Sequence, residues 1–457
     1  MTSTFPGGTG FRQYNDCCDG RSLLLSTQPY DWLTPKTARL FVIFYHGTAP
    51  LRIALSLSKC YTPATTITIG ASLKAAQRAI VDYLAGRYAE YLADLRDMVS
   101  IDCGSQQKEG VDRIGVMMRQ RLEGLGCQVV THHQEQLGDN LVATMAGKGR
   151  LRVLLIGHMD TVYPSGTAQA RPFVIRGRRA YGAGVHDMKV GLLSGYYAMA
   201  ALRAVGWEEF AQITYICNGD EEVGSPSSRP LIEREAARAD AVLVLEGARA
   251  GGRVVTARKG IGSYEVQVYG QAAHTGVALH NGSSAILELA HKVVALHGLN
   301  KRPDGPLVTV SMISGGVAAN VVPPTAAARV DVRVGSHDQL HRLEETFRQL
   351  VETASVRGTK TVIRGGLSRP PMEKTAGVSR LFALAQEAAA ELGFALHDIE
   401  SNGGSDAVFA AALGVPTLDG LGPDGGGPHS DQEYVELESI VPRTAMLARL
   451  IQLLALA

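Results

Sequence analysis

The sequence predicts an α/β protein: a mostly parallel sheet with crossover helices, into which a small two-layer α/β sandwich is inserted. Between residues 140 and 246, short apolar runs rich in β-branched residues alternate with helical segments, as in parallel sheets with crossover connections. Between residues 262 and 367 the order becomes strand, helix, strand, strand, helix, strand, which is typical of a two-layer sandwich. The first pattern then returns, so the second domain is expected to interrupt the first.

We expect four segments along the 457 residues. Residues 1–70 mix turn residues with short apolar runs and show no sustained period, so they are expected to be a poorly ordered extension or to follow a start codon assigned too far upstream. Residues 71–261 and 368–457 are the two parts of the first domain, and residues 262–367 are the inserted domain.

Apolar periodicity predicts the individual elements. Apolar residues recur at helical spacing from Ile80 to Val99, and a second amphipathic helix covers about residues 109–124 before a Gly-Leu-Gly turn. Further helices are expected at about 283–297, 337–355 and 377–392, and from about 438 onward. The strands expected in the first domain are "NLVATMAG", "LRVLLIG", "QITYICN" and "AVLVLEG".

Composition excludes several classes of protein. The net charge is +1 with Lys and Arg scattered, so neither nucleic acid nor an anionic membrane is an expected partner. The six cysteines show no C-x-x-C spacing, which argues against a zinc ribbon or a disulfide framework. The best apolar stretch, residues 39–58, is interrupted by polar residues and a proline, and the N-terminus lacks a signal-peptide pattern. A cytoplasmic protein is therefore expected.

An acidic triplet follows one predicted strand in "ICNGDEEVGS". Asp220, Glu221 and Glu222 repel one another unless water or a cation compensates their charge. An isolated triplet of this kind is ordinarily a solvated turn, so a metal site requires further ligands elsewhere in the chain.

Further polar residues stand in equivalent places. In "LLIGHMDTVYP", His158 ends a strand and Asp160 follows two residues later. This spacing is typical of a carboxylate that orients a metal-bound imidazole. The alternative is that His158 is a hydrogen-bonded structural histidine. Asp187 in "YGAGVHDMKVG" precedes a long helix and could equally be its N-cap. Glu246 ends another strand, and His429 lies in a glycine-rich loop. Because the carboxyl ends of parallel strands converge on one crevice, a shared site is expected.

The predicted ligands are His158, Asp187, Glu222, Glu246 and His429. Two imidazoles and three carboxylates suit zinc, cobalt or manganese better than calcium or magnesium. Five ligands fit two ions that share a bridging carboxylate, and such a pair activates water for hydrolysis. Glu221 then remains as a general base for the bridging water, and Asp220 is expected to be structural.

Seven motifs resemble the dinuclear zinc amidohydrolase family of glutamate carboxypeptidases, aminoacylases, acetylornithine deacetylases and succinyl-diaminopimelate desuccinylases. They are "GHMDTV", "YGAGVHDMK", "NGDEEVGS", "GQAAHTG", "SGGVAANVVPPTAAARVDVR", "GGSDA" and "GPHSDQEYV". The resemblance covers about residues 72–457. It implies a dinuclear zinc exopeptidase domain with two Zn²⁺, a ferredoxin-like lid and dimerisation domain, and a homodimer.

The resemblance also assigns the two metals. Asp187 resembles the bridging ligand, with His158 and Glu246 completing one metal and Glu222 and His429 the other. By the same resemblance Asp160 is the orienting carboxylate, Glu221 is the general base, and a metal-bridging hydroxide is the nucleophile.

Other matches concern the substrate. His274 resembles the lid histidine that stabilises the tetrahedral oxyanion, and Asn320 matches a position that contacts substrate or oxyanion. Arg369 resembles the arginine that binds the substrate's free carboxylate. A guanidinium suits this role because it can donate two parallel hydrogen bonds to a carboxylate. Gly404 and Ser405 fall where the family's loop approaches the substrate backbone.

The motifs look closest to the glutamate carboxypeptidase branch, which implies hydrolysis of a peptidyl or N-acyl amino acid with a free carboxylate. Three features depart from this pattern. Val190 stands where glycine is common, His186 is an unusual neighbour of Asp187, and residues 247–260 show no recognisable glutamate pocket. Arg258 and Lys259 are either its replacement or solvated side chains.

Two rival interpretations stay open. A small-acyl N-acyl-amino-acid deacylase or a dipeptidase would use the same machinery on a different small-molecule substrate. A non-catalytic metal-binding scaffold would dimerise through the lid without turnover, although an intact Glu221 and a complete ligand set argue against it.

Overall fold

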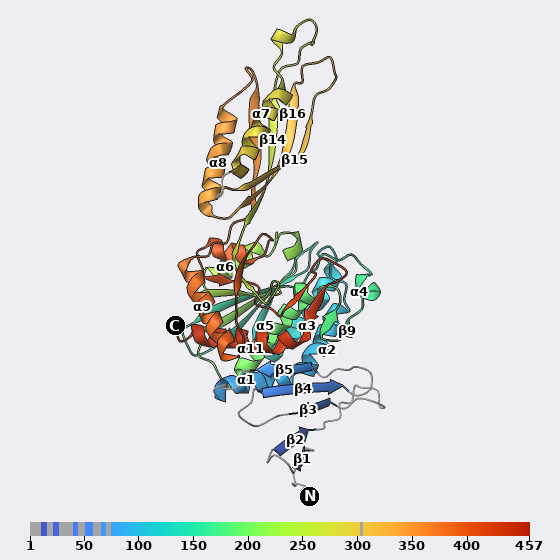
Figure 1. The fold of residues 1–457 in the computed structure, drawn as a ribbon, viewed down its shortest axis with the longest axis vertical. Helices are drawn as coiled ribbons and strands as arrows, with labels where there is room; N and C mark the ends of the chain where they lie inside the picture. Colours follow the sequence, from blue (N-terminus) through green and yellow to red (C-terminus); the bar gives the residue numbers. More distant parts are fainter. Residues whose placement is uncertain are drawn as a thin grey trace. The chain divides into compact units, whose positions relative to one another are not determined.

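The computed structural model describes residues 75–301 and 305–457 and, before residue 75, only the backbone of five strands (Figure 1). These strands are β1 (Phe11–Asn15), β2 (Ser22–Ser26), β3 (Leu40–Ile43), β4 (Leu51–Leu57) and β5 (Thr65–Ile69), paired antiparallel in chain order. The expectation for residues 1–70 otherwise lies outside the described residues and stays a prediction.

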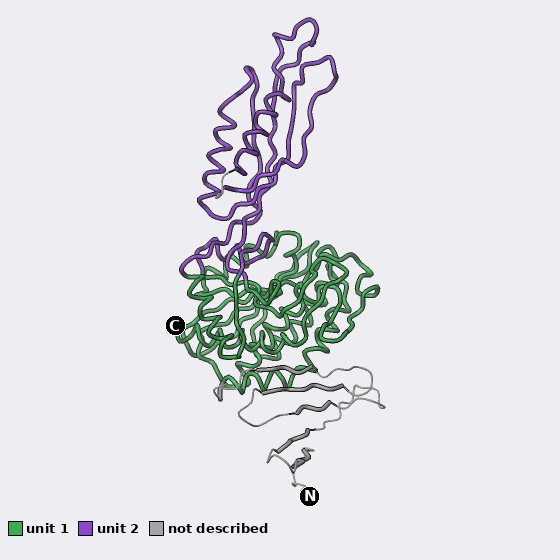
Figure 2. The backbone as a smooth tube through the Cα atoms, viewed as in Figure 1, with its two compact units in different colours: residues 1–254, 377–398, 416–457 green, residues 255–376, 399–415 purple. Residues whose placement is uncertain are grey.

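The chain divides into two compact units, coloured separately in Figure 2. The first comprises residues 1–254, 377–398 and 416–457, and the second comprises residues 255–376 and 399–415. The second unit contains the whole of the expected insertion, 262–367, together with flanking residues and the separate segment 399–415.

The first unit is built on a six-stranded sheet in the order β19-β12-β8-β11-β7-β6. Its strands are β6 (Gln128–His132), β7 (Asn140–Ala146), β8 (Arg152–His158), β11 (Gln212–Asn218), β12 (Ala241–Val244) and β19 (Thr417–Leu418). The pairings of β8 with β11 and β12, and of β12 with β19, are parallel, while β6 and β7 run antiparallel at one edge. The parallel strands are buried on both faces, which explains their continuous apolar sequences.

Helices complete the first unit and supply most of its core. They are α1 (Ala75–Gly86), α2 (Tyr88–Val99), α3 (Lys108–Gly124), α4 (Thr167–Ala170), α5 (Val190–Ala204), α6 (Arg229–Ala236), α9 (Ala376–Glu391) and α11 (Ile440–Leu454). Helix α5 packs against α1, α2 and α11 and is apolar almost all round, so it is buried at the centre of this unit. Among the described helices, none combines the length and apolar character that crossing a membrane requires.

Shorter strands and turns occur in both units. A small four-stranded sheet in the order β20-β21-β10-β9 contains β9 (Val174–Arg176), β10 (Arg179–Tyr181), β20 (Gly425–Gly426) and β21 (Tyr434–Glu436). The strands β13 (Val254–Arg258) and β18 (Asp398–Ser401) form a two-stranded sheet. Single turns are η1 (Val185–Lys189), η2 (Glu221–Val223), η3 (Leu279–Asn281), η4 (Leu299–Lys301) and η5 (Leu437–Ser439).

The second unit contains the predicted two-layer sandwich. Its elements follow the order β14 (Gly260–Tyr269), α7 (Ala285–Gly298), β15 (Leu307–Gly315), β16 (Thr325–Val334), α8 (His337–Glu352) and β17 (Lys360–Arg369). The antiparallel sheet has the order β15-β16-β14-β17, which is the ferredoxin-like arrangement, and α7 and α8 pack against it. Helix α10 (Ala407–Ala412) belongs to the same unit. The predicted fold class is therefore confirmed.

Candidate metal centre

The parallel strands of the first unit place the predicted ligands at one edge of the sheet. His158 is the last residue of β8 and lies directly opposite Asn218, the last residue of β11. The acidic turn begins two residues after Asn218, and Glu246 lies two residues beyond the end of β12. Because these strands are parallel and in register, their carboxyl ends bring the polar residues together.

Asp187 lies between two histidines. Its Oδ1 atom is 3.1 Å from His158 Nε2, and its Oδ2 atom is 3.2 Å from His429 Nε2. His158 Nε2 is also 3.5 Å from Glu246 Oε1, and His429 Nε2 is 3.2 Å from Glu222 Oε2. The structure therefore brings all five predicted ligands together as two histidine–carboxylate pairs, one on each side of the Asp187 carboxylate.

This donor set fits a pair of divalent cations. Ligand atoms of His158, Asp187 and Glu222 lie within 4.8 Å of one another. Among the described residues, the buried Oε1 atom of Glu222 has no hydrogen-bond partner, and a buried carboxylate oxygen requires compensation. Imidazole nitrogens with carboxylate oxygens are the donors that zinc, cobalt and manganese accept.

The electrostatics of the site agree with this interpretation. Burial raises the pKa of Glu222, and the nearby His429 only partly opposes that rise. Burial also acts to raise the pKa of Asp187, but hydrogen bonds from His158 and His429 outweigh it and hold the pKa below its usual range. In the metal-free protein the histidine protons compensate the carboxylates, which is the role that a cation would take over.

Asp187 is not the N-cap of the helix that follows it. Helix α5 begins at Val190 and has Lys189 at its N-cap position, while Asp187 has non-helical dihedral angles (φ −114°, ψ 92°) within η1. The alternative interpretation from the sequence is therefore wrong, and the Asp187 carboxylate is left to face the two histidines.

Asp160 connects the end of β8 to the acidic turn. Its backbone oxygen is 3.0 Å from His158 Nδ1 and its Oδ1 atom is 3.4 Å from the same nitrogen. The carboxylate also accepts the backbone N–H groups of Glu221 and Glu222, both at 3.1 Å, and the Ser105 hydroxyl at 2.6 Å. Asp160 thus holds the His158 ring and the turn that carries Glu221 and Glu222 in one network. Sequence patterns gave no indication of Ser105.

The first residue of the acidic triplet is structural, as expected. Asp220 is fully buried, and its carboxylate accepts hydrogen bonds from the backbone and hydroxyl groups of Ser227 and Ser228. These bonds fold the chain back after η2, so that Glu221 and Glu222 occupy the tip of the turn at the sheet edge.

His186 packs inside the unit. Its side chain is 2% exposed and lies against two glycines: a Cβ atom on Gly247 would come within 2.2 Å of the ring, and one on Gly425 within 2.4 Å. Burial lowers its pKa to about 4, so the ring is neutral. Since Gly247 follows Glu246 and Gly425 precedes His429, the His186 ring fills the space between the segments that carry these two predicted ligands.

A second residue that sequence patterns did not indicate is Glu433, in the quoted motif "GPHSDQEYV". Its side chain is 1% exposed and accepts the backbone N–H groups of Gly184, His186 and Asp187 at 2.8–2.9 Å. Tyr163 Oη donates to the same carboxylate at 2.7 Å. Hydrogen bonds to distant backbone groups leave no periodic signal in a sequence, which is why this residue was not predicted.

The remaining predicted site residues lie in the second unit and form two groups. His274 is exposed, and its segment pairs with the one that contains Asn320, because Thr275 donates its backbone N–H to the Asn320 carbonyl at 3.1 Å. Arg369 lies near Gly404, where an added Cβ atom would come within 2.9 Å of its side chain, and pairs with Asp406 at 3.3 Å.

The structure excludes one of the two alternatives that the sequence left open for Arg258. This side chain is fully buried and donates from Nη1 to the carbonyls of Gly403 and Gly404, at 2.8 and 2.9 Å. The idea that Arg258 is solvated is therefore wrong. Its visible contacts hold the loop that leads into Gly404 and Ser405, and Ser405 is itself fully buried.

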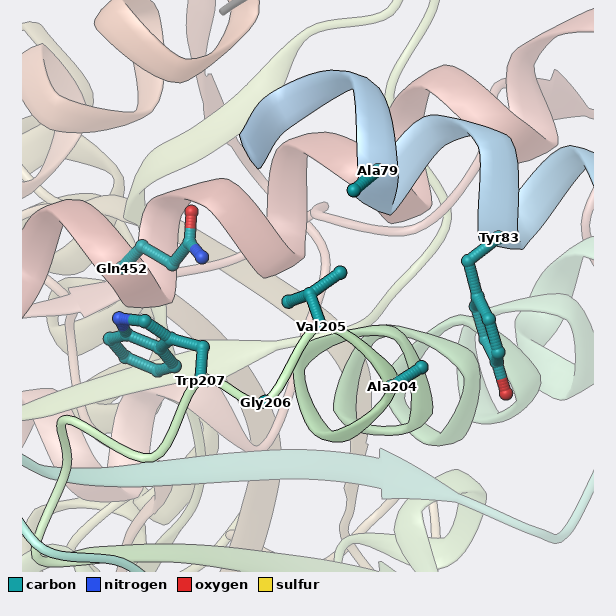
Figure 3. Close-up of a pocket in the computed structure, with 7 residues that line it drawn as sticks. All are labelled: Ala79, Tyr83, Ala204, Val205, Gly206, Trp207 and Gln452. Atoms are coloured by element: carbon teal, nitrogen blue, oxygen red, sulfur yellow. The ribbon is translucent and has the colours of Figure 1, made fainter. Parts of the chain in front are cut away.

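A separate pocket of about 480 Å³ lies in the first unit between α1, the end of α5 and α11 (Figure 3). Tyr83, Val205, Trp207 and Gln452 contribute to its lining. The lining contains no histidine, cysteine or carboxylate, so the pocket offers no ligand for a metal.

A mostly parallel α/β domain with two histidine–carboxylate pairs at its sheet edge and a separate ferredoxin-like domain are features of the metallopeptidase and amidohydrolase class. The family model described as "Peptidase family M20/M25/M40" matches residues 154–453. The chain therefore belongs to this family of hydrolases.

Individual relatives agree. The chain is 32% identical over 367 residues to carboxypeptidase G2 of Pseudomonas sp. (strain RS-16), covering 78% of this chain and 87% of that one. It is 30% identical over 342 residues to acetylornithine deacetylase of Myxococcus xanthus, covering 68% and 82%. Among solved structures, aminopeptidase PepT from Bacillus cereus has the same fold, with a TM-score of 0.67 at 22% identity over 80% of this chain and 99% of that one.

Proposed function

We propose that this protein is a zinc-dependent hydrolase that cleaves the amide bond of a peptidyl or N-acyl amino acid with a free carboxylate, as a glutamate carboxypeptidase does. The observation that carries the proposal is the position of Asp187, whose two oxygens each face a histidine–carboxylate pair. Two Zn²⁺ ions would fit this donor set: His158 and Glu246 would hold one, and Glu222 and His429 the other. Among the relatives, the name carboxypeptidase G2 supports the carboxypeptidase class.

The chemistry follows from the residues around the metals. When bound, such a metal pair lowers the pKa of water and polarises a carbonyl group. Glu221 accepts a proton from the attacking water and donates it to the leaving amine. Asp160 fixes the backbone of Glu221 and the ring of His158, so the base and one ligand keep a defined separation.

Residues of the second unit are proposed to recognise the substrate. The Arg369 guanidinium binds the free carboxylate, since its planar fork pairs with both oxygens of that group. His274 and Asn320 stabilise the oxyanion, and the loop at Gly404 and Ser405 contacts the substrate backbone. The support for these roles is the motif match together with the paired segments at His274 and Asn320.

A small-acyl deacylase is the second candidate function. It is favoured by the similarity to acetylornithine deacetylase, which extends over 82% of that protein. The two candidates share their machinery and differ in the leaving amino acid and in the size of the acyl group.

We further propose that a second copy of the chain binds to the ferredoxin-like unit through α7 and β15. These two elements carry apolar side chains that are at least 43% exposed: Ile286, Leu287 and Val294 on α7, and Met312 and Ile313 on β15. Strand β15 lies at the edge of its sheet and can pair with another strand. A dimer by light scattering, converted to a monomer by Ile313→Lys, is expected; a wild-type monomer would contradict it.

The function is tested by measuring amino-acid release from a panel of peptidyl and N-acyl amino acids with small and large acyl groups. Chelator-stripped protein is assayed with and without zinc. Zinc-dependent release of glutamate from large acyl substrates supports the carboxypeptidase assignment, while release of another amino acid from a small acyl substrate supports the deacylase. No release despite bound zinc contradicts both and favours a non-catalytic scaffold.

A further inference from the structure

The carboxylate of Glu433 is held in a cluster of hydrogen-bond donors. Its Oε1 atom accepts the backbone N–H groups of His186 and Asp187 at 2.8 and 2.9 Å. Its Oε2 atom accepts the backbone N–H of Gly184 at 2.8 Å and the Tyr163 hydroxyl at 2.7 Å. A carboxylate that is 1% exposed is stable as an anion only when donors of this kind replace water.

The local backbone is shaped for this contact. Gly184 has φ of +68°, a left-handed conformation that glycine adopts without cost. A Cβ atom at this position would lie 2.5 Å from Thr161 Cγ2. The segment 184–187 can therefore curl around Glu433 and point three N–H groups at one carboxylate.

Tyr163 extends the network to the loop that carries His429. Its hydroxyl lies 2.9 Å from the Ser430 carbonyl as well as 2.7 Å from Glu433. Arg171 donates to the same Ser430 carbonyl at 2.7 Å and lies over the Tyr163 ring, 4.3 Å from its centroid. Glu433 and Tyr163 thus join the chain segments that follow His158, precede Asp187 and follow His429.

We propose that Glu433 is a positioning residue for the metal centre: it fixes the backbone of segment 184–187 and so sets where Asp187 offers its two oxygens. This inference rests on the proposed function, since it takes Asp187 as the shared ligand. Glu433 contacts backbone N–H groups and a tyrosine. It would therefore act on the cations through the positions of the ligands, directly through segment 184–187 and, by way of Tyr163, through the loop that carries His429.

The inference is tested by zinc affinity, which does not rely on activity. The affinity is measured on chelator-stripped protein by competition with a chromophoric chelator. Glu433→Gln keeps the size of the side chain but replaces one acceptor oxygen with a donor, which faces at least one of the four donors. The expected loss of zinc affinity is about 10- to 100-fold, as for other groups that orient metal ligands. Glu436→Gln is the matched control, because Glu436 lies three residues away and its carboxylate pairs with Arg179 at the surface; its zinc affinity is expected to equal that of the wild type.

Tyr163→Phe provides the second variant. It removes one of the four contacts and leaves the Glu433 carboxylate, so a smaller loss of affinity is expected. If Glu433→Gln does not fold, the zinc affinity of Tyr163→Phe tests the inference: a loss supports it, and a wild-type affinity overturns it. The unfolding midpoint of the metal-free variants separates positioning from general stability: a lower midpoint with unchanged zinc affinity would overturn the inference.

The inference and the proposed function fail in different ways. Zinc affinity of the wild-type level in folded Glu433→Gln overturns the inference alone, whatever the activity. A wild-type protein that binds zinc but releases no amino acid contradicts the proposed function, and the ratio of affinities still decides the role of Glu433. A wild-type protein that binds no zinc contradicts both.

Discussion

Asp160 accepts the backbone N–H of Glu221 at 3.1 Å, and this single bond joins the end of strand β8 to the proposed general base. The other Asp160 oxygen accepts the backbone N–H of Glu222. Asp160 therefore fixes the backbone position of both glutamates in the turn. The turn is therefore positioned by the same residue that contacts the His158 ring.

Replacing Glu221, the proposed general base, should separate catalysis from metal binding. Glu221→Gln is expected to bind zinc normally and to lose about 10²- to 10⁴-fold in kcat, because proton transfer loses its acceptor. Steady-state kinetics with zinc titration measures both quantities. Glu233→Gln, on the exposed face of α6, is the control and should keep wild-type turnover. Turnover near the wild-type level in Glu221→Gln would remove this residue from the mechanism.

Removing the Ser105 hydroxyl should destabilise the protein. Both Ser105 and Asp160 are buried, so Ser105→Ala leaves the Asp160 carboxylate short of a donor. The free energy of unfolding should fall by about 1–3 kcal/mol, measured by denaturant titration. Ser100→Ala, which removes an exposed hydroxyl at the end of α2, should have little effect. Equal stability of the two variants would argue against the Ser105 bond.

Arg369→Ala should mainly raise KM. If the guanidinium binds the ground-state carboxylate of the substrate, the loss of charge-assisted hydrogen bonds raises KM roughly 10- to 100-fold with little change in kcat. Arg364→Ala is the control, because Arg364 is an exposed residue of the same strand. An unchanged KM would place the carboxylate site elsewhere, with Lys259 as the first residue to test.

The metal-free protein should lose stability as the pH rises. Hydrogen bonds with Asp187 and Glu222 raise the pKa of His429 to about 10. Since an unfolded histidine titrates near about 6.5, the protonated form is favoured by folding. Its stabilising contribution is complete below about pH 6.5 and disappears as the pH rises toward the folded-state pKa.

Thermal unfolding of chelator-treated protein between pH 6.5 and 10 checks this expectation. The wild-type midpoint should fall relative to that of His429→Asn over this range. Zinc bound to His429, as proposed, must displace the same proton, so zinc affinity should rise over the same range. Parallel pH profiles for the two proteins would show that His429 does not carry this proton.

Sequence patterns were sufficient for the residues whose place depends on strand direction. His158 ends one parallel strand and Glu246 follows another, so their convergence was predictable from the ends of those strands. The ferredoxin-like unit was predictable because its order of strands and helices is specific. The placement of Asp187 needed the resemblance as well, since an acidic residue before a helix is equally typical of an N-cap.

Residues that bind backbone groups were not predictable. Ser105 and Glu433 contact segments that are distant in the sequence, and neither lies at a position that periodicity marks. For Arg258 the sequence left a solvated side chain as one of two alternatives. A charged side chain ordinarily indicates solvent, but the carbonyl groups of Gly403 and Gly404 replace water around this buried guanidinium.

The most direct test of paired-metal hydrolysis at Asp187 is a zinc titration. Zinc is added stepwise to the chelator-stripped protein, and the hydrolysis of an N-acyl glutamate is measured at each step. Glutamate release should rise with added zinc and level off at two equivalents per chain, and Asp187→Ala should bind less zinc and release none. Two bound zinc ions without release of any amino acid, or full activity in Asp187→Ala, would contradict it.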